Sequence, residues 1–342
     1  MKKLLTILIL GITCSLSGQD YHFSQFFANS QLLNPAMTGN FKEDYRLNFI
    51  HRNQWSAIGS KFQTSTFGGD FKFTGGKLNK DRLGVGVQAY IDDQAGILKT
   101  QGFLLSLGYN HALDDHARHH LGGGLQVGYM SKSLDNSSLT YGSQYQNNQY
   151  NADLSSGEDL SNMNLGNLSM QIGMAYSVDI SKETHAFTGI SAYQITGPSE
   201  SVAGSDNTLG RRYMFNLGMD HVLTDKIIIE PEFMFMVQSG ATDLNIGSLL
   251  KYELRPEFQT NLILGAFYRT SDAAIALIGL EHKGIEAMFS YDVTLTDLRK
   301  TGTYEGANDS NMVGAWEISI VYKGIFRNHN YASEYTVPCG IF

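Results

Sequence analysis

Apolar and polar residues alternate with a period of two along most of the chain. Between Leu168 and Val178 the even positions are apolar, whereas Ser169, Gln171 and Gly173 occupy odd positions. This period is that of a β-strand, whose successive side chains point to opposite faces. The polar positions hold mainly Gly, Ser, Asn and Gln, and the strands of soluble sheets would carry more Lys and Glu there. The pattern therefore predicts strands with one face toward lipid and one toward a lumen.

About fourteen segments show this alternation, and turn residues separate them. They lie near residues 43–52, 62–73, 82–92, 100–112, 119–132, 167–178, 184–195, 211–221, 227–238, 243–252, 260–270, 273–281, 284–292 and 312–323. An even number of short alternating strands is typical of bacterial outer-membrane barrels, in which closure pairs every backbone group. We predict an all-β fold, a transmembrane antiparallel up-and-down β-barrel of outer-membrane type, over residues 43–323.

The lengths of the connections support a direction for this barrel. If the N-terminus lies in the periplasm, the periplasmic connections are short, for example 179–183 and 222–226. The long connections at 133–166, 196–210 and 293–311 then face outward, and those at 239–242 and 271–272 are tight. Short inner turns with longer outer loops are the usual asymmetry of such barrels.

The first residues resemble a targeting signal. Lys2 and Lys3 precede an apolar run from Leu4 to Ile12, and small residues follow. We interpret residues 1–18 as a secretory signal peptide cleaved near residues 17–19, which predicts a location in the outer membrane. Acylation at Cys14 is an alternative, but the preceding residues form a poor lipoprotein signal. Only Cys339 then remains in the mature chain, which excludes a disulfide framework.

Composition and motifs give no sign of enzymatic chemistry. Lys and Arg number 25 against 33 Asp and Glu, a net charge of −8, so a nucleic-acid partner is not expected. The sequence holds no HExxH, GxSxG or P-loop motif. Four histidines and two aspartates could form a metal site or a solvated turn, and we favour the turn; they are His111, Asp114, Asp115, His116, His119 and His120. We predict no catalytic residue, no cofactor and no metal, and therefore no enzyme.

Residues 19–42 precede the first strand, and we predict a periplasmic N-terminal segment there. Phe23, Phe26, Phe27 and Leu33 are spaced so that one helical face can carry them, and the residue before Pro35 ends the helix. We expect this segment to pack in or across the periplasmic mouth as a partial plug, or to dock on a periplasmic partner. A disordered leader is the alternative. Residues 324–342 are predicted to form a periplasmic C-terminal tail.

Several short motifs resemble one family. They are His22-Phe23-Ser24-Gln25-Phe26, Leu33-Asn34-Pro35-Ala36, Arg52-Asn53-Gln54-Trp55, Tyr268-Arg269, Ser290-Tyr291-Asp292 and Trp316-Glu317-Ile318-Ser319. In this order they resemble the PorP/SprF family, the type IX secretion system membrane proteins of Bacteroidota. Two departures are His51, where the family commonly has Tyr, and Pro338 before Cys339. The resemblance covers essentially the whole mature chain.

The resemblance implies an outer-membrane component of the type IX machine that supports export or surface anchoring of a cargo protein such as an adhesin. Some family members are linked to gliding motility. The implied partners are outer-membrane lipids, periplasmic ring components of the machine, and the secreted cargo or its C-terminal domain. We hypothesise that Arg52 points inward to pair with a lumen carboxylate; Trp55 as a simple girdle aromatic is the plainer interpretation.

Two other functions stay open at this point. A passive porin or small-solute transporter would carry charged rings across an open lumen. The residues that could line one are Arg46, Arg52, Asp70, Lys72, Arg212, Asp220, Glu230, Glu232, Lys251, Arg269 and Glu317. A lipid-hydrolysing barrel is the third class, but the many Ser and His residues form no specific set.

Overall fold

The computed structural model describes residues 20–55, 62–78, 80–135, 139–147, 149–157, 164–200, 208–295 and 314–326. Fourteen strands within these ranges close into one antiparallel barrel. Each strand pairs with the barrel strands before and after it in the chain, and β1 pairs with β16 to close the ring. The predicted fold and strand number are confirmed. The signal peptide, Cys14, Cys339 and most of the C-terminal tail lie outside the described residues.

The strand bounds follow the predicted segments closely. The barrel strands are β1 (Tyr45–Gln54), β2 (Phe62–Phe73), β3 (Arg82–Gln94), β4 (Leu98–Ala112), β5 (His119–Leu134), β8 (Asn164–Asp179), β9 (Thr184–Tyr193), β10 (Arg212–Thr224), β11 (Ile227–Gln238), β12 (Ala241–Arg255), β13 (Thr260–Arg269), β14 (Ala273–His282), β15 (Ile285–Thr294) and β16 (Gly314–Gly324). Strands β4, β5 and β8 extend past their predicted outer ends. Polar residues such as Lys99 and Ser133 lie there, so the apolar alternation stops before the backbone ladder does.

The two faces of the wall have opposite chemistry. On β4, Phe103, Leu105 and Leu107 point outward and are about half exposed, at 50–51%. Ser106 and Asn110 on the same strand point inward and are buried. Apolar side chains on the outside and polar ones within are the arrangement that lipid imposes on a barrel. The wall strands could therefore be located from the alternation.

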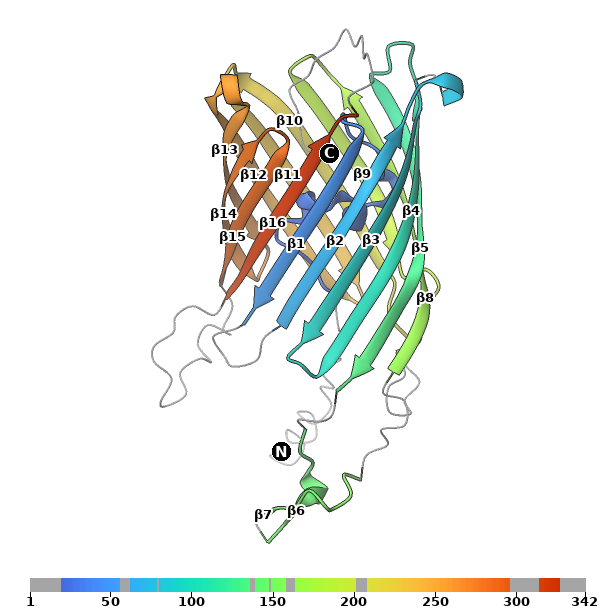
Figure 1. Cartoon of the computed structure of the whole chain (residues 1–342), viewed down its shortest axis with the longest axis vertical. Coiled ribbons are helices and arrows are strands. Elements are labelled where there is room, and N and C mark those ends of the chain that lie inside the picture. The colour runs from blue at the N-terminus through green and yellow to red at the C-terminus, as the bar shows by residue number, and fades with distance from the viewer. Residues whose placement is uncertain are drawn as a thin grey trace, which may run out of the picture.

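The barrel has two unlike ends (Figure 1). At one, which we call the tight-turn end, short connections such as 180–183, 225–226 and 283–284 join the strands. At the other, the loop end, β6 (Tyr145–Gln146) and β7 (Gln149–Tyr150) form a small hairpin beyond the wall. Given the predicted direction, the loop end faces outward. Within the described ranges, no helix is long and apolar enough to cross a bilayer.

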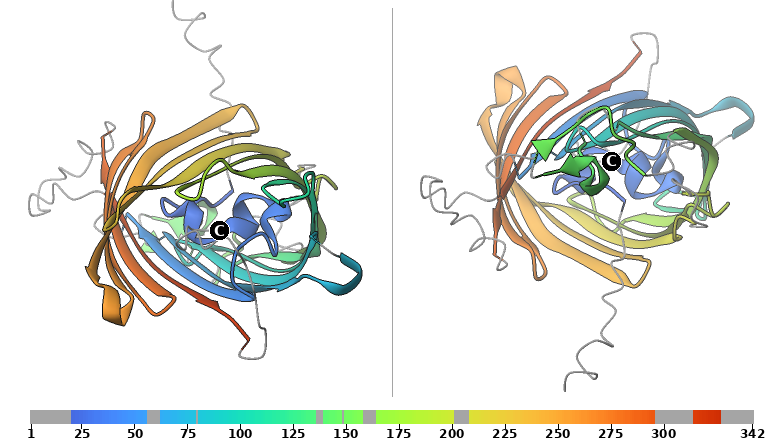
Figure 2. Two further views of the ribbon diagram at one scale, coloured as in Figure 1. Left: turned by 90° about the horizontal axis from the view of Figure 1, so that it is seen from above. Right: turned by 90° about the horizontal axis from the view of Figure 1, so that it is seen from below.

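Residues 20–42, hereafter the plug, lie inside the ring of strands (Figure 2). Three short turns form its body: η1 (Phe26–Ala28), α2 (Ser30–Leu33) and η2 (Pro35–Met37). The backbone N–H of Asp20 donates to Gln238 near the loop end, at 2.8 Å. Thr38 lies against Gly84 near the tight-turn end. The plug thus reaches deeper into the lumen than a segment resting at the periplasmic mouth.

The expectation of one continuous helix in the plug is wrong. Asn29 has an extended φ of −132° between η1 and α2, and its side chain accepts the N–H of Leu32. Asn34 is also extended, with φ −160° and ψ 121°, as the residue before Pro35 should be. Contacts with the wall outweigh helix continuity here, because a helix this short has little stability of its own.

Candidate functional site: the occupied lumen

Four charged side chains meet the plug near the loop end. Arg52 on β1, Arg269 on β13, Asp292 on β15 and Glu317 on β16 point inward, and we call this group the latch. All four are 0–3% exposed. Arg52 forms ion pairs with Glu317 and with Asp292, and Arg269 also pairs with Asp292. Two arginines against two carboxylates leave the latch without net charge, which is how buried ions are normally tolerated.

The side chains of the latch bind the backbone of the plug. Glu317 accepts the N–H of Ser24 at 2.7 Å and that of Gln25 at 2.8 Å, one on each carboxylate oxygen. The hydroxyl of Ser24 donates to Asp292 at 2.6 Å and accepts from Arg52 at 2.9 Å. Hydrogen bonds to charged groups contribute more than neutral ones, about 1.5–3 kcal/mol each. The hypothesis that Arg52 points inward to a lumen carboxylate agrees with this geometry.

Gln25 extends the network with its side chain. Its amide nitrogen donates to Ser290 at 2.9 Å, and its amide oxygen accepts from Ser319 at 2.6 Å. Ser290 and Ser319 each lie two residues from a latch carboxylate, on the same face of the strand. Sequence reasoning did not select these two serines as site residues, although their inward parity was available as a signal.

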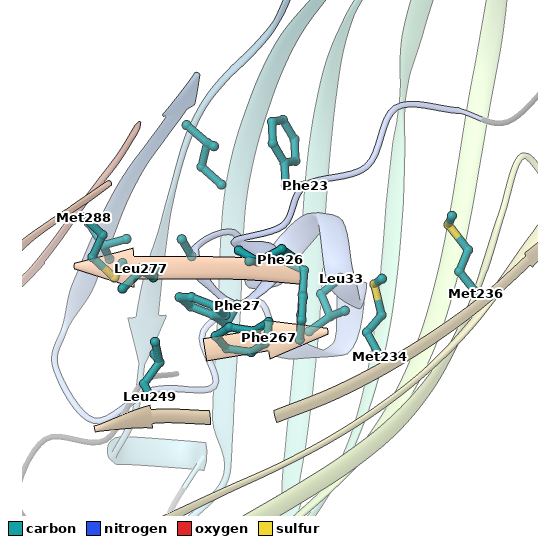
Figure 3. Packing of buried hydrophobic residues seen from close by; sticks show 14 of the residues in the cluster. Phe23, Phe26, Phe27, Leu33, Met234, Met236, Leu249, Phe267, Leu277 and Met288 are labelled. Carbon is teal, nitrogen blue, oxygen red and sulfur yellow. The ribbon is translucent and has the colours of Figure 1, made fainter. Parts of the chain in front are cut away.

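Beyond the latch, the plug buries an apolar surface against the wall (Figure 3). The ring of Phe27 stacks on Phe267 of β13, with centroids 5.4 Å apart, and Phe26 meets the same ring edge-on. The cluster also contains Phe23, Leu33, Ile50, Tyr193, Met214, Met234, Met236, Leu249, Ile263, Ile275, Leu277, Met288 and Val321. Burying an apolar side chain of this size contributes about 1.5–3 kcal/mol. This sector of the inner wall is therefore apolar, whereas we expected weakly polar faces throughout.

The opposite side of the plug rests on glycines. Asn34 donates to the carbonyls of Met174 at 3.0 Å and Ile190 at 3.3 Å, across β8 and β9. A Cβ built on Gly173 would lie 1.9 Å from the amide oxygen of Asn34, and one on Gly124 would lie 2.2 Å from the backbone at Pro35. The inward glycines leave room for the plug backbone, as glycine commonly does at close approaches.

A second ionic contact fixes the plug near the tight-turn end. Arg46 on β1 and Asp70 on β2 form a two-point pair, at 3.0 and 2.8 Å. Asp70 also accepts the N–H of Gly39 at 2.8 Å, and Arg46 donates to the carbonyl of Met37 at 3.3 Å. The plug is thus bonded at both ends of the lumen, which keeps its short turns in place.

The structure brings some of the motif residues together and not others. His22 lies 3.7 Å from Asp243, at the edge of the latch. Asn53 is buried, and its amide oxygen has no hydrogen-bond partner within the described ranges. Gln54 ends β1. Trp55 has a left-handed φ of 58° and packs on Phe62 at the loop-end rim. Tyr291 lies on the outer face of β15, between the inward Ser290 and Asp292.

The charges that could have lined an open pore have two other roles. Arg46, Arg52, Asp70, Arg212 and Arg269 contact the plug. A separate buried group nearer the tight-turn end centres on Lys251, which lies 3.0 Å from Glu286 and 3.3 Å from Glu230. Among the described residues, no group of His, Cys, Asp and Glu is arranged to hold a metal ion. The histidines near the 113–118 turn bind neighbours instead, for example His111 to Asp81 and His119 to Tyr176.

Together, the wall and the lumen define a class: an outer-membrane β-barrel whose own N-terminal segment occupies its interior. The family model of the type IX secretion system membrane protein PorP/SprF matches residues 15–322. The chain belongs to this family. It is therefore a barrel component of the type IX secretion system, and its fold and family are those of an outer-membrane protein rather than of a known enzyme class. No curated protein matches the chain.

Solved structures with a similar fold include a hydrocarbon channel and a toluene transporter. A FadL homologue from Pseudomonas aeruginosa is 10% identical with a TM-score of 0.50, and the match covers 85% of this chain and 92% of that one. The CymD monoaromatic hydrocarbon channel is 12% identical with a TM-score of 0.50, covering 91% and 96%. The toluene transporter TbuX from Ralstonia pickettii is 11% identical with a TM-score of 0.49, covering 87% and 93%. These likenesses concern the fold alone.

Proposed function

We propose that this barrel, whose lumen is closed by the plug, holds a secreted partner for the type IX machine. It would support the export of that partner or the anchoring of that partner at the cell surface. The observation that carries the proposal is the plug. Its backbone is bonded to Glu317 on one side of the lumen, and its body rests on Gly124 and Gly173 on the other. A porin for polar solutes would need a water-filled path where these contacts lie.

The charged residues support a holder over a porin. Rings of charge in a porin face water and select solutes. Here the guanidinium groups of Arg52 and Arg269 bind the hydroxyl of Ser24, and that of Arg46 binds the plug backbone. Because these guanidinium groups already donate hydrogen bonds to the protein itself, they are poorly placed to select a solute.

The two ends of the barrel suit different partners. The apolar outer face contacts outer-membrane lipids. In the proposed orientation the tight-turn end faces the periplasmic ring components, and the loop end, with the exposed Tyr145 and Tyr150, faces the cargo or its C-terminal domain. A cargo of the adhesin type would connect this copy to attachment or gliding motility.

Deleting residues 20–33 while keeping the signal peptide tests the proposal. We expect a folded barrel, recognised by its heat-modifiable migration in gels, that no longer retains its cargo at the cell surface. In planar bilayers the full chain should be electrically quiet and the deleted chain should conduct. Normal cargo display by the deleted chain, or a steady open pore in the full chain, would contradict the proposal and favour a porin.

A further inference from the structure

A cavity of about 210 Å³ lies beside the first plug residues, at the loop end of the lumen. The plug contributes Asp20 and Tyr21 to its wall, and the inner faces of β3, β4, β5 and β10 contribute most of the rest. Sites for small-molecule ligands usually measure about 300–1,000 Å³. This cavity is smaller than that, and its size suits a single side chain.

The charged groups of this wall are unequal in number. Three carboxylates, those of Asp20, Asp92 and Glu200, line the cavity with two basic groups, those of Lys132 and Arg212, so the formal charge of the wall is −1. Lys132 forms an ion pair with Glu200, and Arg212 lies 3.9 Å from Asp20. Both bases therefore already have an acidic neighbour, and the third carboxylate has no basic one. This balance favours a cationic ligand over an anionic one.

The carboxylate without a basic neighbour is that of Asp92, which is 7% exposed. Its two oxygens accept hydrogen bonds from the Thr64 hydroxyl at 2.6 Å and the Gln94 amide at 3.0 Å, and both donors are neutral. Asp92 forms no ion pair with any described residue. A carboxylate has about four acceptor positions, so two remain available. Because a buried charge is normally paired, Asp92 is suited to receive a cation from outside the barrel.

Two tyrosine hydroxyls line the same cavity. Tyr90 lies two residues before Asp92 on the inner face of β3, is 5% exposed, and packs on Tyr21 with ring centroids 4.8 Å apart. Neither hydroxyl forms a hydrogen bond with a described residue. A primary ammonium group has three N–H donors and no acceptor, which matches one carboxylate and two hydroxyl oxygens. Aromatic rings also attract cations. The polar part of the wall is thus complementary to an ammonium group.

The remaining wall is apolar. Leu98, Leu104, Met130 and Leu209 line the cavity beside its charged and aromatic groups. Lysine commonly places its aliphatic stem on apolar surface while its charged end stays in a polar environment. A metal ion or a free ammonium ion has no such stem and would leave the apolar surface uncovered. The combination of walls therefore favours a lysine side chain.

We propose that this cavity receives one lysine side chain of the secreted partner, whose ammonium group is bound by Asp92 and by the hydroxyls of Tyr21 and Tyr90. The inference rests on the proposed function for the presence of such a partner at the loop end. It adds the place where the partner is bound and the kind of residue that is recognised there. Because Tyr21 belongs to the plug, the plug forms part of the binding site as well as closing the lumen.

Peptide binding to the purified full-length barrel in detergent tests the site directly. The probes are capped tripeptides, acetyl-Gly-X-Gly-amide with X as lysine, norleucine or glutamate, titrated by saturation-transfer NMR with empty micelles as the blank. Norleucine keeps the aliphatic stem and lacks the charge. Since hydrogen bonds to charged groups are the stronger ones, we expect the lysine peptide to bind at least about tenfold more tightly than the norleucine peptide. Equal binding of these two peptides, or tighter binding of the glutamate peptide, would overturn the inference.

Two neighbouring aspartates provide a variant and its matched control. Asp92→Asn removes the charge and keeps an oxygen that can accept from Thr64, so the barrel should keep its heat-modifiable migration while the lysine peptide binds at least about tenfold more weakly. Asp93 points to the outer face of β3 and does not line the cavity, so Asp93→Asn should leave binding unchanged. Equal weakening by both variants would mean that the general field of the barrel attracts the peptide, and would contradict the site.

A further variant tests the hydroxyls, and the cell tests the partner. Tyr90→Phe keeps the ring and removes one acceptor, so it should weaken the lysine peptide about threefold and leave the norleucine peptide unchanged. Unchanged lysine binding would exclude Tyr90 from the site. If Asp92→Asn loses lysine binding but still displays its cargo normally, the cavity does not receive the partner, and this inference is wrong while the proposed function stands. If deletion of residues 20–33 also leaves display normal, the proposed function is wrong as well.

Discussion

Glu317, on the inner face of the last barrel strand, accepts the backbone N–H of Ser24 at 2.7 Å. The contact joins residues 293 positions apart and ties the plug to the strand that closes the ring. The other oxygen of Glu317 accepts from Gln25, and Arg52 balances its charge. The carboxylate of Glu317 therefore bonds the plug to the strand that closes the barrel.

Replacing Glu317 by Gln should release the N-terminal part of the plug and leave the barrel folded. A glutamine amide offers one acceptor where two N–H groups now bind, and it leaves Arg52 short of a counter-charge. Removing one partner of a buried ion pair typically costs about 3–5 kcal/mol. The measurement is labelling of a cysteine placed at Ser30 by a water-soluble maleimide, which should accelerate. Glu253→Gln, at a half-buried position near the tight-turn end of β12, is the matched control, and equal labelling in both variants would refute a holding role for Glu317.

Two adjacent glycines of β5 should respond differently to substitution by alanine. A Cβ on Gly124 would meet the backbone of Pro35 and Ala36 at 2.2 Å, whereas one on Gly123 meets nothing within 4 Å. Gly124→Ala must displace η2, and overpacking of this kind costs about 1–3 kcal/mol. Gly123→Ala should be nearly neutral. Gel-shift melting temperature and cysteine labelling in the plug should change only for Gly124→Ala; a similar change for both variants would mean that strand propensity, not plug contact, dominates.

How much of the structure can be predicted from the sequence depends on which interaction determines each part of it. Lipid forces every wall strand to alternate, so the strands could be located to within a few residues. The Arg52–Glu317 pair could also be predicted, because the first and last strands of a closed barrel must pair. In the observed register these two residues are direct partners. Arg269 and Asp292 could not be paired in this way, since β14 lies between their strands and the two residues are not register partners.

The conformation of the plug could not be predicted from the sequence, for a related reason. Its backbone groups bind side chains that lie up to about 290 positions away, so local helix propensity had little weight. One available signal was overlooked. Phe233, Met234, Phe235 and Met236 are consecutive apolar residues in β11, and this break in alternation indicates an apolar neighbour inside the barrel as well as outside.

Acid should weaken one contact at the tight-turn end. Asp81 accepts hydrogen bonds from the Tyr109 hydroxyl, the Ala112 N–H and His111, and these, the Tyr109 bond first, lower the pKa of its carboxyl from 3.8 to about 2. A lowered pKa means that the stabilisation is complete above the ordinary value and is lost as the pH falls through about 2. Asp81→Asn should remove this dependence between pH 5 and pH 2. The gel-shift melting temperature over that range is the measurement, and identical slopes for the variant and the wild type would exclude Asp81 as a contributor.

The stacked pair Phe27 and Phe267 should couple plug to wall in a measurable way. Either Phe→Ala change removes a buried ring, which typically costs about 3–5 kcal/mol, and leaves a space that Met234 can partly fill. Because the two rings contact each other, the double variant should cost less than the sum of the single ones, with a coupling of about 0.5–1.5 kcal/mol. Plug release, followed by maleimide labelling at a cysteine in place of Ser30 across a urea series, gives the four free energies. Phe67→Ala serves as the control, since Phe67 is 57% exposed on the lipid face and should not change labelling. Strict additivity of Phe27→Ala and Phe267→Ala would mean that the two rings stabilise the plug independently, and that their stacking does not hold it in the lumen.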